Sequence, residues 1–173
     1  VAIVGLVVGI VAAVIPRALE AGDKAKAKGD LTAIVAAIKA YRQEYGRYPV
    51  GPSKMDQASD EFNSWYGPPT TEKDSKTLMQ VLAGDSNAKF EGVVMNPKGI
   101  RFFEGPKSDG TFQDPWGNQY AVKMDTNESG GVEYYNPAGN AENIRVSVIA
   151  ISLGKNKVQE DPDKKTTKTC DDV

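Results

Sequence analysis

The sequence predicts an α+β fold in which one long N-terminal helix packs against a small antiparallel β-sheet. Residues 1–45 are rich in helix-forming side chains, and their second half carries apolar residues at steps of three and four. Three short strand candidates lie between residues 119 and 152. A chain of 173 residues is long enough for one such domain.

The first part of the predicted helix is entirely apolar, since Val1–Ile15 contains no charged or polar side chain. Fifteen helical residues reach about 22 Å, less than the roughly 30 Å hydrocarbon core of a bilayer. We therefore expect Val1 to be a cut point rather than the natural start of the segment. A retained helix fits better than a cleaved secretory signal, because the apolar run continues into a helical pattern.

Small residues in this apolar part indicate close helix packing. Gly5 and Gly9 are four residues apart, and Ala12 and Ala13 add further places where two helix backbones can approach. The alternative is that Gly and Ala are simply common in membrane helices. Pro16 removes one backbone donor and is expected to kink or locally melt the helix, which then resumes.

The second part of the helix is amphipathic and is expected to lie on a folded head. Gly46 supplies a C-terminal cap, and Pro49 follows shortly after it. The apolar stripe consists of Leu31, Ile34, Val35, Ile38, Tyr41 and Tyr45.

The next stretch predicts a long irregular loop and a short helix. Residues 50–74 are rich in Ser, Asp, Gly and Pro. Ser75–Leu82 is expected to be helical, with Ser75 as its N-cap and Gly84 as its stop. Ile100–Phe103 is a candidate short extended piece. The aromatic anchors expected in the loop are Phe62, Trp65 and Tyr66.

The strand candidates are Gln119–Met124, Gly131–Tyr135 and Ile144–Ser152, the first two joined by a turn at Asp125–Gly130. The third alternates in polarity and predicts a strand with one buried face. The tail Lys155–Val173 is highly charged and is expected to be disordered unless something ties it down.

Composition excludes several kinds of chemistry. The chain has no His and one Cys, so His-based catalysis, His-ligated metals and an intrachain disulfide are impossible. Lys and Arg number 21 against 23 Asp and Glu, a balance that argues against nucleic-acid binding. We predict that the protein is not an enzyme; a carboxylate-pair hydrolase remains conceivable, but no acid pair is evident.

Four stretches resemble the bacterial type IV pilin-like proteins, most closely the major pseudopilins of type II secretion and the related prepilin-type proteins with a cleaved, methylated N-terminus. Their order and spacing agree along nearly the whole chain. A fifth stretch, Asn96–Ile100, also resembles the prepilin-type branch. The four are Ala12-Ala13-Val14-Ile15-Pro16, Gly46-Arg47-Tyr48-Pro49, Asp114-Pro115-Trp116-Gly117-Asn118-Gln119-Tyr120 and Ser152-Leu153-Gly154.

The resemblance implies a subunit stored in the bacterial inner membrane and then assembled into a helical filament, periplasmic or extracellular. Residues 1–30 would form the exposed hydrophobic helix for membrane storage and the filament core. Residues 31–173 would form a pilin-like head with loop 50–74, a sheet at about 119–152 and a C-terminal loop at 153–173. Implied partners are further copies of the chain, other pseudopilins and an inner-membrane assembly platform, whereas the family's N-terminal Phe and Glu would lie upstream of Val1.

The resemblance also implies calcium. Leu153, Asn156, Asp171 and Asp172 fall near positions at which the major pseudopilins bind Ca²⁺, and oxygen ligands suit this ion. Asn156 stands where an acidic residue is usual. The alternative is a solvated acidic tail.

Asp114, Pro115, Trp116, Gly117 and Asn118 are interpreted as a structural turn. In it Asp114 would cap backbone donors, Pro115 would fix φ and Trp116 would plug the domain. The main alternative to a filament subunit is a membrane-anchored monomeric periplasmic binding module, in which loop 50–74 recognises a partner. Concentration-dependent fibres would separate these two hypotheses.

Overall fold

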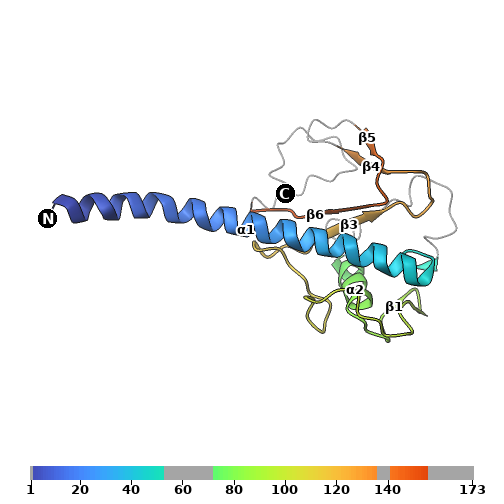
Figure 1. Cartoon of the computed structure of the whole chain (residues 1–173). Helices are drawn as coiled ribbons and strands as arrows, with labels where there is room; N and C mark the ends of the chain where they lie inside the picture. The colour runs from blue at the N-terminus through green and yellow to red at the C-terminus, as the bar shows by residue number, and fades with distance from the viewer. Residues whose placement is uncertain (1, 53–71, 136–140, 156–173) are drawn as a thin grey trace.

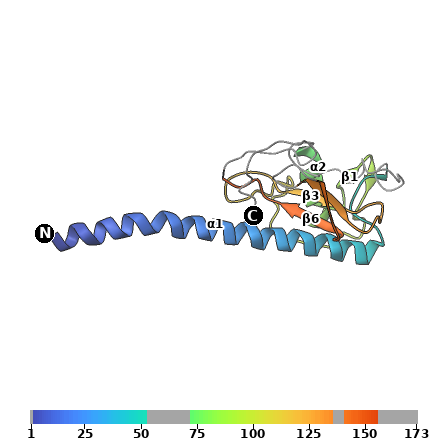
Figure 2. The same cartoon turned by 90° about the horizontal axis from the view of Figure 1, so that it is seen from above.

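The computed structural model describes residues 2–52, 72–135 and 141–155. Within them the fold is α+β, as expected, and Figure 1 shows the head gathered along the C-terminal half of the long helix while the N-terminal half projects away from it. Figure 2 shows the same arrangement from above. The elements are α1 (Ala2–Tyr45), α2 (Glu72–Leu82), β1 (Lys89–Phe90), β2 (Val93–Val94), β3 (Ala121–Met124), β4 (Val132–Tyr135), β5 (Ala141–Ile144) and β6 (Val148–Ile151).

Helix α1 has 44 residues and continues through Pro16 without interruption. At 1.5 Å per residue it is about 66 Å long. The expected local melting at Pro16 is therefore wrong. A proline removes a single backbone hydrogen bond, and the uninterrupted helix on both sides of it holds the segment helical.

The apolar stripe of α1 forms the centre of the head, as the sequence predicts. Leu31, Ile34, Ile38 and Tyr41 are buried, and Val35 and Tyr45 pack partly buried against them. The stripe meets apolar residues from α2, the following loop and β3, among them Leu78, Met79, Leu82, Met95, Val122 and Met124.

The two helices end as expected, but α2 begins earlier than Ser75. The Gly46 amide donates to the Arg42 carbonyl (2.8 Å), and Gly46 has φ of +67°. After α2 the amides of Gly84 and Asp85 bond back to Val81 and Gln80, a Schellman closure.

Ser75 is not an N-cap. Because α2 starts at Glu72, Ser75 lies inside the helix, and its buried hydroxyl donates to the Tyr120 carbonyl at 3.1 Å. This hydrogen bond ties α2 to the start of β3. The last residues of the segment expected to be a loop, 72–74, are therefore helical.

The strands form antiparallel pairs rather than one sheet with β3 beside β4. β3 pairs with β6, and β4 pairs with β5. The candidate Ile144–Ser152 is divided: Ile144 ends β5, a tight bend follows, and β6 begins at Val148. The expectation of one buried face is wrong for the first half of this candidate, since Ile144 and Val146 are 36% and 40% exposed.

A hairpin of β1 and β2 was not predicted. Its two-residue turn has Glu91 at φ of +51° and Gly92 at +81°, as a type I′ turn requires. Ile100–Phe103 forms no strand; the amides of Phe102 and Phe103 instead bond to the Leu82 carbonyl at the end of α2. The anchors Phe62, Trp65 and Tyr66, and the tail beyond Lys155, lie outside the described residues.

Candidate functional site

The residues expected to pack between helices all lie in the projecting half of α1. Gly5, Gly9, Ala12, Ala13 and Pro16 belong to one uninterrupted helix (Figure 1). Because steps of three and four residues return to the same side of a helix, these positions form one row along it. The row extends beyond the head in both views (Figures 1 and 2).

The head begins to cover α1 at Ala27, which is fully buried. From Arg17 to Lys26 the helix is exposed except at the half-buried Asp23, and Leu19 is 64% exposed. Leu19 is a large apolar side chain that the described part of the chain leaves in water. Burial of such a side chain against a partner contributes about 1.5–3 kcal/mol.

A hydrogen bond between Tyr120 and Asp30 marks the point where α1 enters the head. The Tyr120 hydroxyl donates to Asp30 Oδ2 at 2.8 Å, and the Tyr120 ring is fully buried. Burial, and then the adjacent Asp30 carboxylate, raise the pKa of Tyr120. Sequence analysis did not identify this contact, because the two residues lie 90 positions apart in the chain.

Asn96 joins the end of α1 to the end of α2 and is fully buried. Its Nδ2 donates to the carbonyls of Val81 (2.8 Å) and Ile100 (2.7 Å). Its Oδ1 accepts from the Ile100 amide (3.1 Å) and from the Tyr45 hydroxyl (2.6 Å). All four hydrogen-bonding positions of the side chain are therefore used, which fixes the segment Asn96–Ile100 against the helix.

Aromatic rings close the same end of the core. Tyr41 and Tyr45 lie 4.6 Å apart between ring centroids, and Phe102 meets Tyr41 edge-on at 5.5 Å. The Tyr41 hydroxyl donates to the Met95 carbonyl at 2.6 Å, and burial raises the pKa of Tyr41 to about 12. Outside the rings, Lys98 pairs with Glu44 and lies over the Tyr45 ring. These tyrosines are core residues in the structure.

Arg42 joins the helix to the turn after β3. Its guanidinium lies 4.6 Å from the Tyr48 ring centroid, donates to the Tyr48 hydroxyl and pairs with Glu128. The Tyr48 hydroxyl in turn donates to the Ser147 carbonyl at 3.3 Å. Arg42 therefore fixes this end of α1 both to Tyr48 and to the turn after β3.

The turn at residues 114–118 is organised by the buried carboxylate of Asp114. Oδ1 accepts from the amides of Trp116 (3.0 Å) and Asn118 (2.8 Å), and Oδ2 accepts from Ser152 Oγ at 2.7 Å. Gly117 has φ of +88°. Pro115 and Trp116 are only half-buried, so Trp116 does not plug the core.

The same turn holds the start of the C-terminal segment. Asn118 Nδ2 donates to the Gly154 carbonyl at 2.8 Å, and the Gly154 amide donates to Ser152 Oγ. The buried Leu153 lies between these two anchors. Asn156, Asp171 and Asp172, the other expected calcium ligands, lie outside the described residues. Among residues 2–52, 72–135 and 141–155, no group of three Cys, Asp or Glu residues is placed to hold a metal.

An open groove of about 500 Å³ lies between the end of α2 and the loop at residues 101–108. Phe103 lines it, and the charges of Asp85, Arg101, Glu104 and Lys107 surround it. Two acidic and two basic groups give it no net charge, so its chemistry favours no particular ligand.

Comparison with protein families, curated proteins and solved structures found no match to this chain. Within the described residues, no helix combines the length and the apolar character needed to cross a membrane.

Proposed function

We propose that the protein is the structural subunit of a helical filament, a type II secretion pseudopilus or a related type IV pilus-like fibre with a pilin-like fold. The subunit is stored in the inner membrane and assembles by packing of its N-terminal helices, together with other pseudopilins and an inner-membrane platform. Its role is mechanical rather than catalytic.

The observation that supports this proposal is that the two halves of α1 differ in their surroundings. Its C-terminal half is buried in the head through Leu31, Ile34, Ile38 and Tyr41. Its N-terminal half has an apolar sequence and projects from the head (Figure 1). An apolar helix that projects from the head is stabilised by lipid or by further copies of itself, and a filament core supplies the second.

Packing of these helices requires little change in backbone solvation. An α-helix satisfies its own backbone groups, so it can pass from lipid to a protein core without exposing them. Gly5 and Gly9 permit close approach of two backbones, which increases van der Waals contact.

Calcium binding at the C-terminal loop is part of the proposal. The hydrogen bonds of Asp114 and Asn118 fix the backbone on both sides of Leu153. A carbonyl at Leu153 and the oxygens of Asn156, Asp171 and Asp172 are donors that suit Ca²⁺. The ion would hold the C-terminal segment onto the turn at residues 114–118.

Assembly of the full-length protein tests the proposal. We expect regular fibres by electron microscopy and in high-speed pellets after detergent removal, and fewer fibres in EGTA than in Ca²⁺. The variant Gly5→Leu/Gly9→Leu should abolish fibres because its side chains separate the helices. Gly22→Leu is the matched control, since Gly22 lies in the same helix with nothing within 4 Å of a Cβ.

Monodisperse monomers at every concentration would reject the filament and favour the membrane-anchored binding module. Fibres that are indifferent to EGTA would reject calcium alone.

A further inference from the structure

The turn after β3 contains a sequence that the proposed function does not use. Asn127-Glu128-Ser129 has the form Asn-X-Ser with X other than Pro, and no other Asn of the chain has Ser or Thr at that spacing. Enzymes that attach N-linked glycans recognise this sequence in surface loops of exported proteins. A match of three residues indicates a modification site only where the fold presents it to solvent.

The fold places this sequence on the surface. Glu128, Ser129 and Gly130 are exposed, and Asn127 itself is half-buried. The buried carboxylate of Asp125 holds the turn by accepting from the amides of Ser129 (2.9 Å) and Gly130 (3.1 Å). The three residues therefore form an ordered turn that an enzyme can reach from solvent.

The carboxamide of Asn127 uses its oxygen within this turn and leaves its nitrogen available. Oδ1 accepts from the Ser129 amide at 3.3 Å, an Asx turn in which Glu128 has φ of +54°. Nδ2 donates to no atom of the described residues. By contrast, Nδ2 of Asn96 and Nδ2 of Asn118 each donate two hydrogen bonds. The atom to which a glycan is joined is therefore engaged in those two residues and available in Asn127.

The same geometry suits the transfer reaction. A carboxamide nitrogen is a weak nucleophile because its lone pair is shared with the carbonyl group. Loss of a proton from Nδ2 of Asn127 frees this pair, and the Ser129 amide stabilises the charge that develops on Oδ1. Nδ2 then bonds to C1 of a sugar while the bond from C1 to a lipid-linked pyrophosphate breaks. The pyrophosphate leaves with that electron pair, and the proton passes to a carboxylate base of the transferase.

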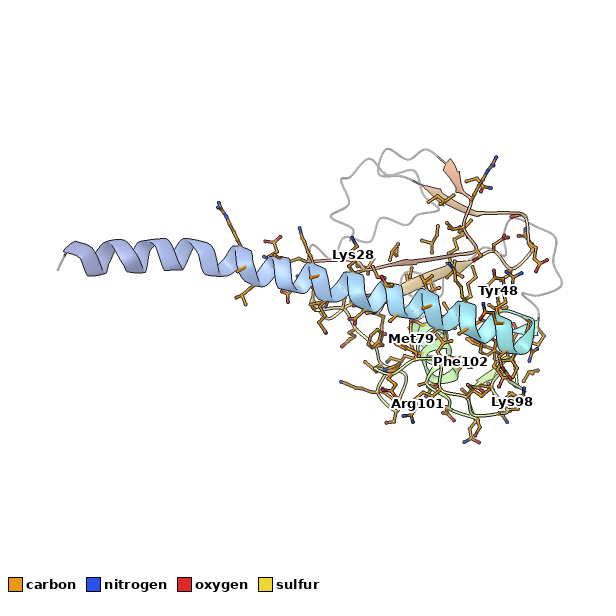
Figure 3. All side chains as sticks on the ribbon, viewed as in Figure 1. Lys28, Tyr48, Met79, Lys98, Arg101 and Phe102 are labelled. Carbon is orange, nitrogen blue, oxygen red and sulfur yellow. The ribbon has the colours of Figure 1, made fainter. Side chains whose placement is uncertain are left out.

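A glycan on this turn would not obstruct packing of the N-terminal helices. Glu128 pairs with Arg42, which lies 26 residues beyond Pro16, or about 39 Å along the helix. Arg42 also lies over the ring of Tyr48, which Figure 3 shows at the end of α1 opposite the projecting half. A bulky, water-soluble group at this end is compatible with a fibre whose core consists of the projecting halves.

We propose that Asn127 carries an N-linked glycan, transferred to Nδ2 from a sugar that is attached to a lipid-linked pyrophosphate. Such a modification requires the head to lie outside the cytoplasm and so rests on the proposed function. It adds a covalent group to the head and leaves the contact between helices unchanged.

Mass spectrometry of the full-length protein purified from its native cells tests this proposal. We expect an intact mass above that of the sequence and a glycan on the tryptic peptide Met124–Arg145, which contains Asn127. Asn127→Gln and Ser129→Ala should each lose the added mass and migrate faster on denaturing gels. Ser129→Thr should retain the added mass, because Thr also supplies the hydroxyl that the transferase requires. Asn143→Gln is the matched control, since Asn143 is exposed in the same peptide but has no Ser or Thr at the required spacing.

An unmodified Asn127 in the wild-type protein would overturn the proposal, as would added mass that persists in Asn127→Gln. The wild-type measurement does not depend on the folding of any variant, and circular dichroism checks that the variants fold. Fibres made of unmodified chains would reject the glycan alone. A glycosylated chain that never forms fibres would support the glycan and reject the filament.

Discussion

Replacement of Asn96 by Ala should be among the most destabilising single changes in the head. The side chain is fully buried and makes four hydrogen bonds, two to backbone carbonyls, one from a backbone amide and one from the Tyr45 hydroxyl. Ala leaves the Val81 and Ile100 carbonyls and the Ile100 amide without these partners.

The magnitude follows from these bonds. Each is worth about 1 kcal/mol net, and buried groups left unpaired raise the penalty, so the loss should be roughly 3–5 kcal/mol. A chain of this size loses about 2–4 °C in Tm per kcal/mol, which gives a fall of roughly 10 °C. That is a large fraction of the typical stability of a domain, about 5–15 kcal/mol.

Urea and thermal unfolding, followed by circular dichroism, measure the effect. Asn87→Ala is the matched control because Asn87 is exposed, and it should change the free energy of unfolding by less than about 0.5 kcal/mol. Tyr45→Phe removes one of the four bonds and should cost about 1 kcal/mol. Equal stability of Asn96→Ala and Asn87→Ala would refute the role assigned to Asn96.

Two further predictions concern glycine and tyrosine residues of the head. A Cβ at Gly110 would overlap the Lys76 carbonyl oxygen, whereas a Cβ at Gly117 meets nothing within 4 Å. Because both have positive φ, Gly117→Ala should cost about 1 kcal/mol and Gly110→Ala more than about 3 kcal/mol in urea unfolding; similar losses would contradict the predicted clash. The fold raises the pKa of both Tyr41 and Tyr120 and so favours their neutral forms. Their contribution to stability is intact below pH 10.0, and that of Tyr41 falls as pH rises to about 12. Tyrosinate absorbance should then lag behind that of a model peptide until unfolding, and simple titration at pH 10.0 would exclude the effect.

The elements that local chemistry dictates were predictable from the sequence. The apolar steps in α1, the Gly46 and Gly84 ends, and the strands at β3 and β4 are each read from residues close together in the chain. The turn at Asp114 is similar, since its amide contacts lie within four residues.

Other features could not be predicted, either because they join residues far apart in the chain or because their local sequence is atypical. The bond from Tyr120 to Asp30 spans 90 residues, and nothing near Asp30 indicates its partner. The hairpin turn Glu91-Gly92 lacks the Asn-Gly or Asp-Gly pair that usually identifies this turn type. Ser75 resembles a cap locally, but its hydroxyl is directed to β3. β3 likewise pairs with β6 rather than with β4, its neighbour in the chain, and β6 packs against α1.

The most direct test of the filament account is a cryo-electron microscopy reconstruction of fibres formed by the full-length protein. The account predicts α1 helices packed along the fibre axis, with Gly5 and Gly9 at helix crossings and the heads outside. Fibres held together only by the heads, with residues 2–16 of each chain apart from those of its neighbours, would contradict it.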